Sequence, residues 1–211
     1  VEVSPINGIS MTSNIEFRHS FSNRFIDLRR SSIYMKLAIT DSNGNDLQVT
    51  EDKPCAFVQN VSASIFNRLQ LFLNGKMVCD SGPVNHAMKA YMETELFENS
   101  FTKQALGIAG WAMPGTEDDI EYPTHVGYAY RRNMHLQKTG VEFIGPIHLS
   151  MFQQDRLLLN FLDLRLVARL NDPAFFLEVF DPTQTADIGY KYKIIDLKLR
   201  LMEVELADSA K

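Results

Sequence analysis

The stretch that decides the fold is residues 141–170, which read VEFIGPIHLSMFQQDRLLLNFLDLRLVARL. Its second half alternates between apolar and polar side chains. The apolar positions are Leu162, Leu164, Leu166, Ala168 and Leu170, and the polar positions between them are Asp163, Arg165 and Arg169. A period of two predicts a β-strand with one face buried and the other in water. Gly145-Pro146 ends a separate apolar strand that begins at residue 141.

Other segments of the chain repeat this strand pattern. Strands are predicted at residues 15–17, 32–40, 69–73, 76–79, 141–149, 162–170, 174–180 and 190–206. Asn74-Gly75 joins two of them, and it is a strong hairpin signal because both turn positions need a positive φ. Short strands with turns between them favour two packed sheets. We therefore predict an all-β fold, an antiparallel eight-stranded jelly-roll β-sandwich.

One helix-bearing insertion is expected at about residues 84–125. Asn85 opens a helical stretch in which Met88, Met92 and Leu96 form an apolar stripe. A second short helix is predicted around 102–108, and residues 110–125 are interpreted as an exposed loop. A helical excursion cannot lie inside a sheet-on-sheet core. We therefore place the insertion at one end of the sandwich and expect all helices to be confined to it.

Composition favours one globular unit over residues 1–211. The chain has 45% hydrophobic residues and a net charge of −5, which fits a single domain with a sizeable core. No apolar run reaches the ~20 residues of a membrane span, and the opening residues lack the pattern of a signal peptide. Arg29-Arg30 and Arg131-Arg132 are isolated basic pairs, so direct nucleic-acid binding is not expected. Cys55 and Cys79 are expected to be small buried side chains.

No residue pattern points to catalysis or to a bound cofactor. The chain has five scattered histidines, which are His19, His86, His125, His135 and His148. None forms a His-x-His pair on one face of a strand, so no metal site is predicted. Glu95 and Glu98 share a helical face, but acids on an amphipathic helix are usually its solvated side. Glu117-Asp118-Asp119 lacks the ligand spacing of a calcium loop. We predict that the protein is not an enzyme.

Three segments resemble one known family. Residues 145–164 match its Gly-Pro turn, F-x-Q triplet and RLLLN strand through Gly145, Pro146, Phe152, Gln154, Arg156–Asn160 and Asp163-Leu164. Residues 66–96 match its strand, NGK turn and helix at Leu69, Leu71, Leu73, Asn74–Lys76, Ala90, Tyr91, Glu93, Thr94 and Leu96. Tyr190–Asp196 is similar to its terminal YKxKIxD strand. The family is that of the major capsid proteins of Polinton (Maverick) elements and adintovirus-like viruses.

This resemblance implies a structural role in a virion. Family members carry two jelly rolls in one chain, and the matched motifs belong to the first. The chain is therefore either an excised N-terminal domain or a natural single-roll relative. The resemblance implies a building block of an icosahedral shell, of the major capsid (hexon) type, that assembles as trimers or pseudo-hexamers with other capsid proteins.

A lone roll exposes apolar surface, so we also predict self-association of this chain. The candidate interface residues are Phe101, Trp111, Met113 and Phe152, because aromatic and methionine side chains concentrate in interface cores. Trp111 has two interpretations: it either anchors its loop against the sandwich or enters a neighbouring subunit.

Two alternatives belong to other classes of protein. A jelly-roll binding module would recognise a carbohydrate or protein ligand at its loop end, where Trp111, Tyr122 and Tyr128 are the suggestive aromatic residues. A jelly-roll enzyme of the cupin type is disfavoured, because the histidine pattern of its metal site is missing.

Overall fold

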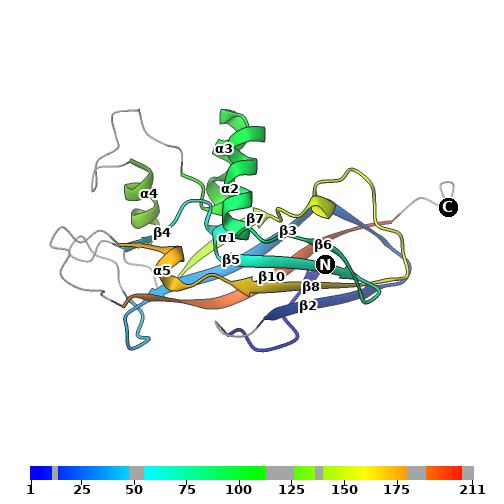
Figure 1. The fold of residues 1–211 in the computed structure, drawn as a ribbon, viewed down its shortest axis with the longest axis horizontal. Coiled ribbons are helices and arrows are strands. Elements are labelled where there is room, and N and C mark those ends of the chain that lie inside the picture. Colours follow the sequence, from blue (N-terminus) through cyan, green and yellow to red (C-terminus); the bar gives the residue numbers. More distant parts are fainter. Residues whose placement is uncertain (11–13, 48–54, 113–125, 136–139, 180–188, 206–211) are drawn as a thin grey trace.

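Two antiparallel four-stranded sheets face each other in the computed structural model, which describes residues 1–10, 14–47, 55–112, 126–135, 140–179 and 189–205 (Figure 1). The first, here called the β3 sheet, has the order β1 (Glu2–Val3), β10 (Lys191–Val204), β3 (Phe25–Thr40), β7 (Val141–Pro146). The second, the β8 sheet, has the order β2 (Ile15–Phe21), β8 (Leu162–Leu170), β5 (Phe66–Leu73), β6 (Lys76–Asp80). A small sheet pairs β4 (Cys55–Phe57) with β9 (Leu177–Val179).

The strand order is that of a jelly roll. β2 and β3 are consecutive in sequence but lie in opposite sheets, and the same holds for β7 and β8. Strand β10, near the end of the chain, pairs with both β1 and β3. The two main sheets together contain eight strands, and their pairs are antiparallel. The predicted antiparallel eight-stranded jelly-roll β-sandwich is therefore confirmed.

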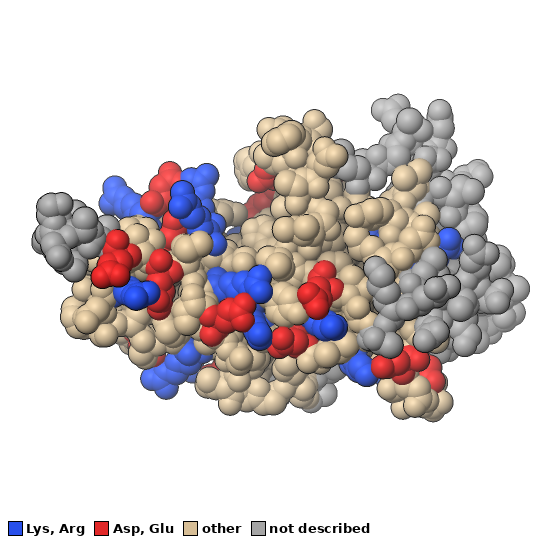
Figure 2. All heavy atoms as spheres, turned by 180° about the vertical axis from the view of Figure 1, so that it is seen from behind, with Lys and Arg blue, Asp and Glu red and all other residues tan. Residues whose placement is uncertain are grey.

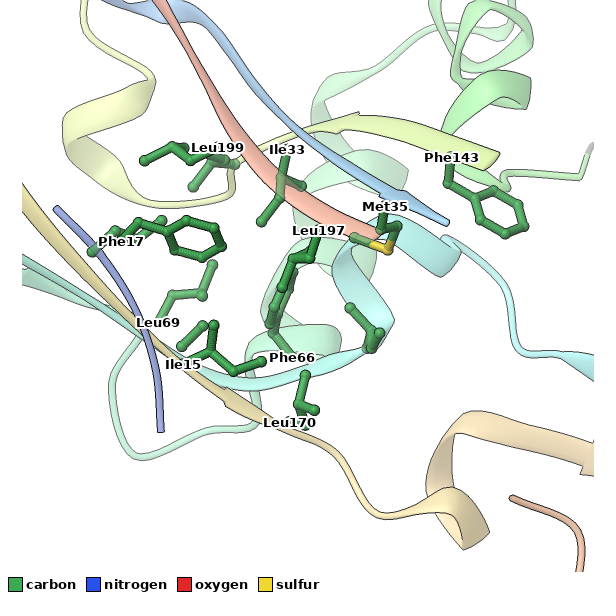
Figure 3. Packing of buried hydrophobic residues seen from close by; sticks show 14 of the residues in the cluster. Ile15, Phe17, Ile33, Met35, Phe66, Leu69, Phe143, Leu170, Leu197 and Leu199 are labelled. Atoms are coloured by element: carbon green, nitrogen blue, oxygen red, sulfur yellow. The ribbon is translucent and has the colours of Figure 1, made fainter. Parts of the chain in front are cut away.

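The core lies between the inner faces of the two sheets. Figure 3 shows Phe17 of β2 and Leu69 of β5 pointing into the same space as Ile33 of β3 and Leu199 of β10. All four side chains are buried, as their alternation with polar residues predicts. Full burial of one such side chain stabilises the fold by about 1.5–3 kcal/mol relative to leaving it exposed.

The outer face of the β3 sheet carries ion pairs instead. Lys36 pairs with Glu142 at 3.4 Å, and Lys198 and Arg200 both pair with Glu2. On the side of the molecule seen in Figure 2, basic and acidic side chains are interspersed rather than segregated. A nucleic acid on this face would meet acidic as well as basic side chains. The acidic side chains would repel its phosphates and lower its affinity for the protein.

Several predicted strand boundaries differ from the observed ones. Strand β2 continues to Phe21 rather than residue 17, β5 begins at Phe66 rather than residue 69, and β7 ends at Pro146 rather than residue 149. Strand β3 begins at Phe25 rather than residue 32, because its first part pairs with the last residues of β10. The strand predicted at 174–180 is instead a short helix, α5 (Pro173–Phe176), followed by β9. The Asp172 side chain accepts a hydrogen bond from the Ala174 N–H at 2.9 Å, and proline occupies the first helical position. These helix-start signals outweigh the apolar run.

The helices are not confined to one insertion, contrary to the prediction. They are α1 (Val61–Ser64), α2 (His86–Phe97), α3 (Ser100–Ala105), the 3-10 helix η1 (Leu106–Ala109), α4 (Val126–His135), the 3-10 helix η2 (Ser150–Phe152) and α5. Helices α1, α4 and α5 lie outside residues 84–125. Helices α2 and α3 stand out from one side of the sandwich, above α1 and β5, rather than from its end (Figure 1).

The turn between β5 and β6 has the predicted geometry. Asn74 and Gly75 both have positive φ, at 48° and 77°, so the hairpin prediction is confirmed. Asn74 Oδ1 also accepts a hydrogen bond from the Asp163 N–H at 2.8 Å, which ties the turn to the start of β8.

Substitution of Gly75 tests this turn. A Cβ at position 75 would meet no atom within 4 Å, so Gly75→Val is expected to destabilise through backbone strain alone, by about 1–2 kcal/mol. Equilibrium urea unfolding measures the difference. Lys76→Val, at the exposed first residue of β6, is the control, and equal losses of stability in the two variants would contradict the strain argument.

Candidate subunit interface

Helix α2 buries its small residues and exposes its large apolar ones. Ala87, Ala90 and Thr94 are buried where α2 packs against α1 and β5. Alanine side chains let two backbones approach closely, so this face fits the narrow space above α1. The apolar stripe of Met88, Met92 and Leu96 lies on the other face of the helix, where all three side chains are exposed.

Helix α3 and the 3-10 helix η1 extend this exposed apolar area. Phe97 and Phe101 are 79% and 81% exposed, far above the value for a packed aromatic side chain. We call the whole set the α2–α3 apolar surface, and it consists of Met88, Tyr91, Met92, Leu96, Phe97, Phe101 and Ile108. In Figure 2 the protruding unit is mostly free of charged side chains. Contiguous apolar areas of this kind mark contact sites for a partner.

The structure separates the four candidate interface residues. Phe101 lies on the α2–α3 apolar surface. Trp111 and Phe152 are 2% and 4% exposed, so they are already enclosed by their own chain. Met113 lies outside the described residues. The subunit interface therefore stays a prediction. Among the described candidates, Phe101 is the one whose side chain is exposed and can contact another subunit.

Trp111 anchors the end of the helical insertion. Its ring stacks on Tyr91 of α2, with centroids 5.7 Å apart, and the Lys103 ammonium lies 5.8 Å from the ring centroid. Of the two interpretations of Trp111, the anchor is the one that this geometry supports. Of the three aromatic residues of the binding-module alternative, Trp111 and Tyr128 are buried, and Tyr122 lies outside the described residues.

A buried polar cluster ties α2 to the segment after β7. Glu93 Oε2 accepts a hydrogen bond from Gln153 at 2.8 Å and lies 3.1 Å from His148 Nδ1. Lys89 pairs with Glu93 from one turn earlier. The rings of His86 and His148 meet edge to face, with centroids 6.3 Å apart. Glu93 thus holds a helix to a loop. Glu95, which the sequence places on one helical face with Glu98, pairs with Lys103.

Acid is expected to weaken this anchoring through His86. Burial, aided by electrostatic repulsion from His148 and Lys89, lowers the pKa of His86 to about 3. The unfolded chain binds this proton near pH 6.5, whereas the folded chain does not. The stabilising contribution is therefore complete above pH 6.5 and is lost as the pH falls from there towards 3.

The size of this effect follows from linkage. One such group lowers the free energy of unfolding by about 2 kcal/mol between pH 6.5 and pH 5. Urea unfolding of the native chain and of His86→Gln over pH 5–7.5 measures it. The variant should show a shallower loss at low pH, and parallel curves would contradict the assignment to His86.

A buried arginine holds helix α4 to the small β4–β9 sheet. The Arg131 guanidinium donates to the Phe57 carbonyl at 2.8 Å and to Gln59 Oε1 at 3.1 Å, and it pairs with Glu178 at 2.6 Å. The sequence showed only an isolated basic pair at this position. Nothing in the local sequence distinguishes the buried Arg131 from the less buried Arg132 beside it.

Metal-binding groups do not gather in the described part of the chain. Within it, no group of three or more His, Cys, Asp or Glu side chains could hold a metal ion. Cys55 and Cys79 are free thiols and buried, as predicted. Burial raises the pKa of Cys55 to about 12, so its reactive thiolate is suppressed. No helix among the described segments has the length and apolarity needed to cross a membrane.

The strand order and the core define the class of protein as an antiparallel jelly-roll β-sandwich with a protruding helical unit. The sequence matches no protein-family model. Among solved structures, the chain is similar to the mavirus major capsid protein, with a TM-score of 0.57 and 10% sequence identity. The match covers 100% of this chain and 47% of that one. At this identity the likeness shows the fold alone.

A curated protein also matches in sequence. The chain is 28% identical over 194 residues to an uncharacterized protein of Caenorhabditis elegans. The match covers 89% of this chain and 43% of that protein. The chain therefore spans less than half the length of each of these two proteins.

Proposed function

We propose that this chain is a structural jelly-roll building block of a virion-type capsid shell and has no enzymatic role. The likeness of its fold, over its whole length, to part of the mavirus major capsid protein supports this proposal. The similarity of its motifs to Polinton-type capsid proteins supports it independently. Residues 1–211 act as one jelly-roll domain, and its place is in the capsid of a particle.

The α2–α3 apolar surface is the observation that carries the proposal. The sandwich closes its own core without these side chains, since they lie outside the buried cluster. Large exposed residues on a protruding unit are costly to leave in water, whereas a second protein surface would cover them. A building block of a shell needs such a contact, and an isolated enzyme domain does not.

The proposed partner of this surface is another copy of the same chain. Identical chains usually satisfy such surfaces with closed rotational symmetry, so a trimer or pseudo-hexamer is the expected particle. Apolar burial would contribute roughly 25 cal/mol per Å² before the costs of association are subtracted. Moderate salt should therefore leave the assembly intact, because screening acts on charges and not on apolar contacts.

Light scattering after size exclusion tests this assembly. At tens of micromolar, the native chain should be larger than the 24.0 kDa monomer, and negative-stain images should show rings or shells. The double variant Phe97→Ser with Phe101→Ser should shift to the monomer while keeping its melting temperature. Met202→Ser, an exposed apolar position on β10, is the matched control and should leave the particle unchanged. A native chain that is only monomeric would overturn self-assembly.

A further inference from the structure

Two arginines face each other on the outer side of the β8 sheet. Arg68 of β5 and Arg169 of β8 are directly opposite in the strand register, and both are exposed while Ala168 and Leu170 beside Arg169 are buried. Like charges at directly opposed positions destabilise a sheet. Such a pair is a local conflict with folding, and conflicts of this kind concentrate at functional sites.

Arg169 differs from the other outward arginines of this sheet. The others have acidic partners, which are Asp163 for Arg18, Asp80 for Arg68 and Glu16 for Arg165. Arg169 forms no ion pair or hydrogen bond within the described ranges of the chain. Among the described residues, its guanidinium group is thus a charged donor without an acceptor.

Arg169 lines a pocket of about 610 Å³ at the base of α2. The lining is completed by Asn67, Arg68, Asp80, Gly82, Pro83, Val84 and Asn85. The register between β5 and β8 shifts at Asn67, and this bulge lies in the pocket wall. Bulges often redirect side chains next to binding sites. The volume lies within the range of pockets that hold small ligands.

The charge of the pocket indicates an anion with one acidic group. Asp80 accepts hydrogen bonds from Arg68, Gln70 and the Gly82 N–H, and Arg68 keeps the pKa of Asp80 at about 2. The Arg68–Asp80 pair is therefore internally neutralised. Arg169 alone remains to receive an oxyanion, and a guanidinium fork matches the geometry of a carboxylate. A polyphosphate would need more unpaired cations than the pocket supplies.

The rest of the lining is both polar and apolar. Asn67 donates through its amide nitrogen to Asn171 at 3.2 Å, which leaves its carbonyl oxygen as an acceptor for hydroxyl groups. Pro83 and the exposed Val84 supply an apolar wall. From this combination, we propose that the pocket binds an acidic saccharide, with its carboxylate on Arg169, its hydroxyls near Asn67 and an apolar ring face on Pro83 and Val84.

Ligand-observed NMR titration of the full chain tests this site, with sialyllactose as the acidic probe and lactose as its neutral counterpart. Sialyllactose should bind saturably, and lactose should not. Arg169→Gln should weaken binding about tenfold or more, because it removes a charge-assisted hydrogen bond. Arg165→Gln is the matched control, since Arg165 is the preceding outward arginine of β8 and does not line the pocket. Its affinity should be unchanged.

Competitors distinguish the possible sources of the anion. Sodium sulfate at moderate concentration should displace sialyllactose only weakly, because it makes none of the hydroxyl or apolar contacts. Equal binding of free sulfate would reduce the site to a simple anion site and overturn the saccharide assignment. Tighter binding of penta-glutamate would overturn it in favour of an acidic peptide. Sialyllactose binding that survives in Arg169→Gln would overturn the role of Arg169.

Discussion

Gly145→Ala is expected to lower the free energy of unfolding by about 3 kcal/mol, because there is no room for a side chain at this position of β7. A Cβ there would overlap the Ser62 hydroxyl and lie 2.6 Å from Ser62 Cβ and 3.1 Å from Ala109 Cβ. Ser62 belongs to α1 and Ala109 to η1, so the glycine sets how closely these elements pack on the β3 sheet. The Ser62 hydroxyl can rotate away, but the Cβ atoms of Ser62 and Ala109 are fixed by the backbone and cannot.

Thermal and urea unfolding measure this loss. For a chain of this size, about 3 kcal/mol corresponds to a fall in melting temperature of roughly 6–12 °C. Gly8→Ala is the matched control, since a Cβ at Gly8 would meet no atom within 4 Å. A melting temperature of Gly145→Ala that equals the control value would show that α1 is not packed so closely on β7.

Arg131→Ala is expected to have a comparable effect, about 3–5 kcal/mol, for an electrostatic reason. The Arg131 side chain is buried and joins α4 to Phe57, Gln59 and Glu178. Burial raises the pKa of Glu178 to about 7. The Arg131 guanidinium, 2.6 Å away, favours the charged form of this carboxyl group. Removal of Arg131 takes a hydrogen-bond donor from the Phe57 carbonyl and from the partly buried Glu178 carboxyl group.

A pair of companion variants separates charge from volume. Arg30→Ala removes an exposed arginine whose ion pair with Asp27 is 3.6 Å long, and it should cost less than about 1 kcal/mol. The double variant Arg131→Met with Glu178→Met should recover much of the loss, because it replaces the pair with apolar side chains. Hydrogen exchange should locate the loosening of Arg131→Ala in α4 and β4. Stability equal to that of Arg30→Ala would contradict the buried network.

Much of the fold could be predicted from local sequence. The alternation from Leu162 to Leu170 predicts β8 at its observed bounds, because period two and burial of one face are properties of a strand itself. Asn74-Gly75 predicts its turn for a similar reason, since few other residues adopt positive φ at low cost. Asn85 predicts the start of α2, because a cap acts within one turn.

The candidate site could be predicted only in part. Periodicity identifies α2 as a helix, but it does not say which face is buried. The stripe of Met88, Met92 and Leu96 is the more apolar face, yet Ala87 and Ala90 are the side chains that fit against α1. The burial of Trp111 could not be predicted either, because Tyr91 and Lys103, which lie against its ring, are far from it in sequence or on another helix.

The sequence by itself determined the class of fold, because strand period, turn chemistry and helix caps are local and each acts over a few residues. Tertiary structure alone decided which apolar residues remain exposed. It also decided that Arg131 is buried and that Arg169 has no acidic partner among the described residues. Each of these depends on a partner far away in sequence. Burial and charge pairing are properties of the packed neighbourhood, and no local pattern encodes them.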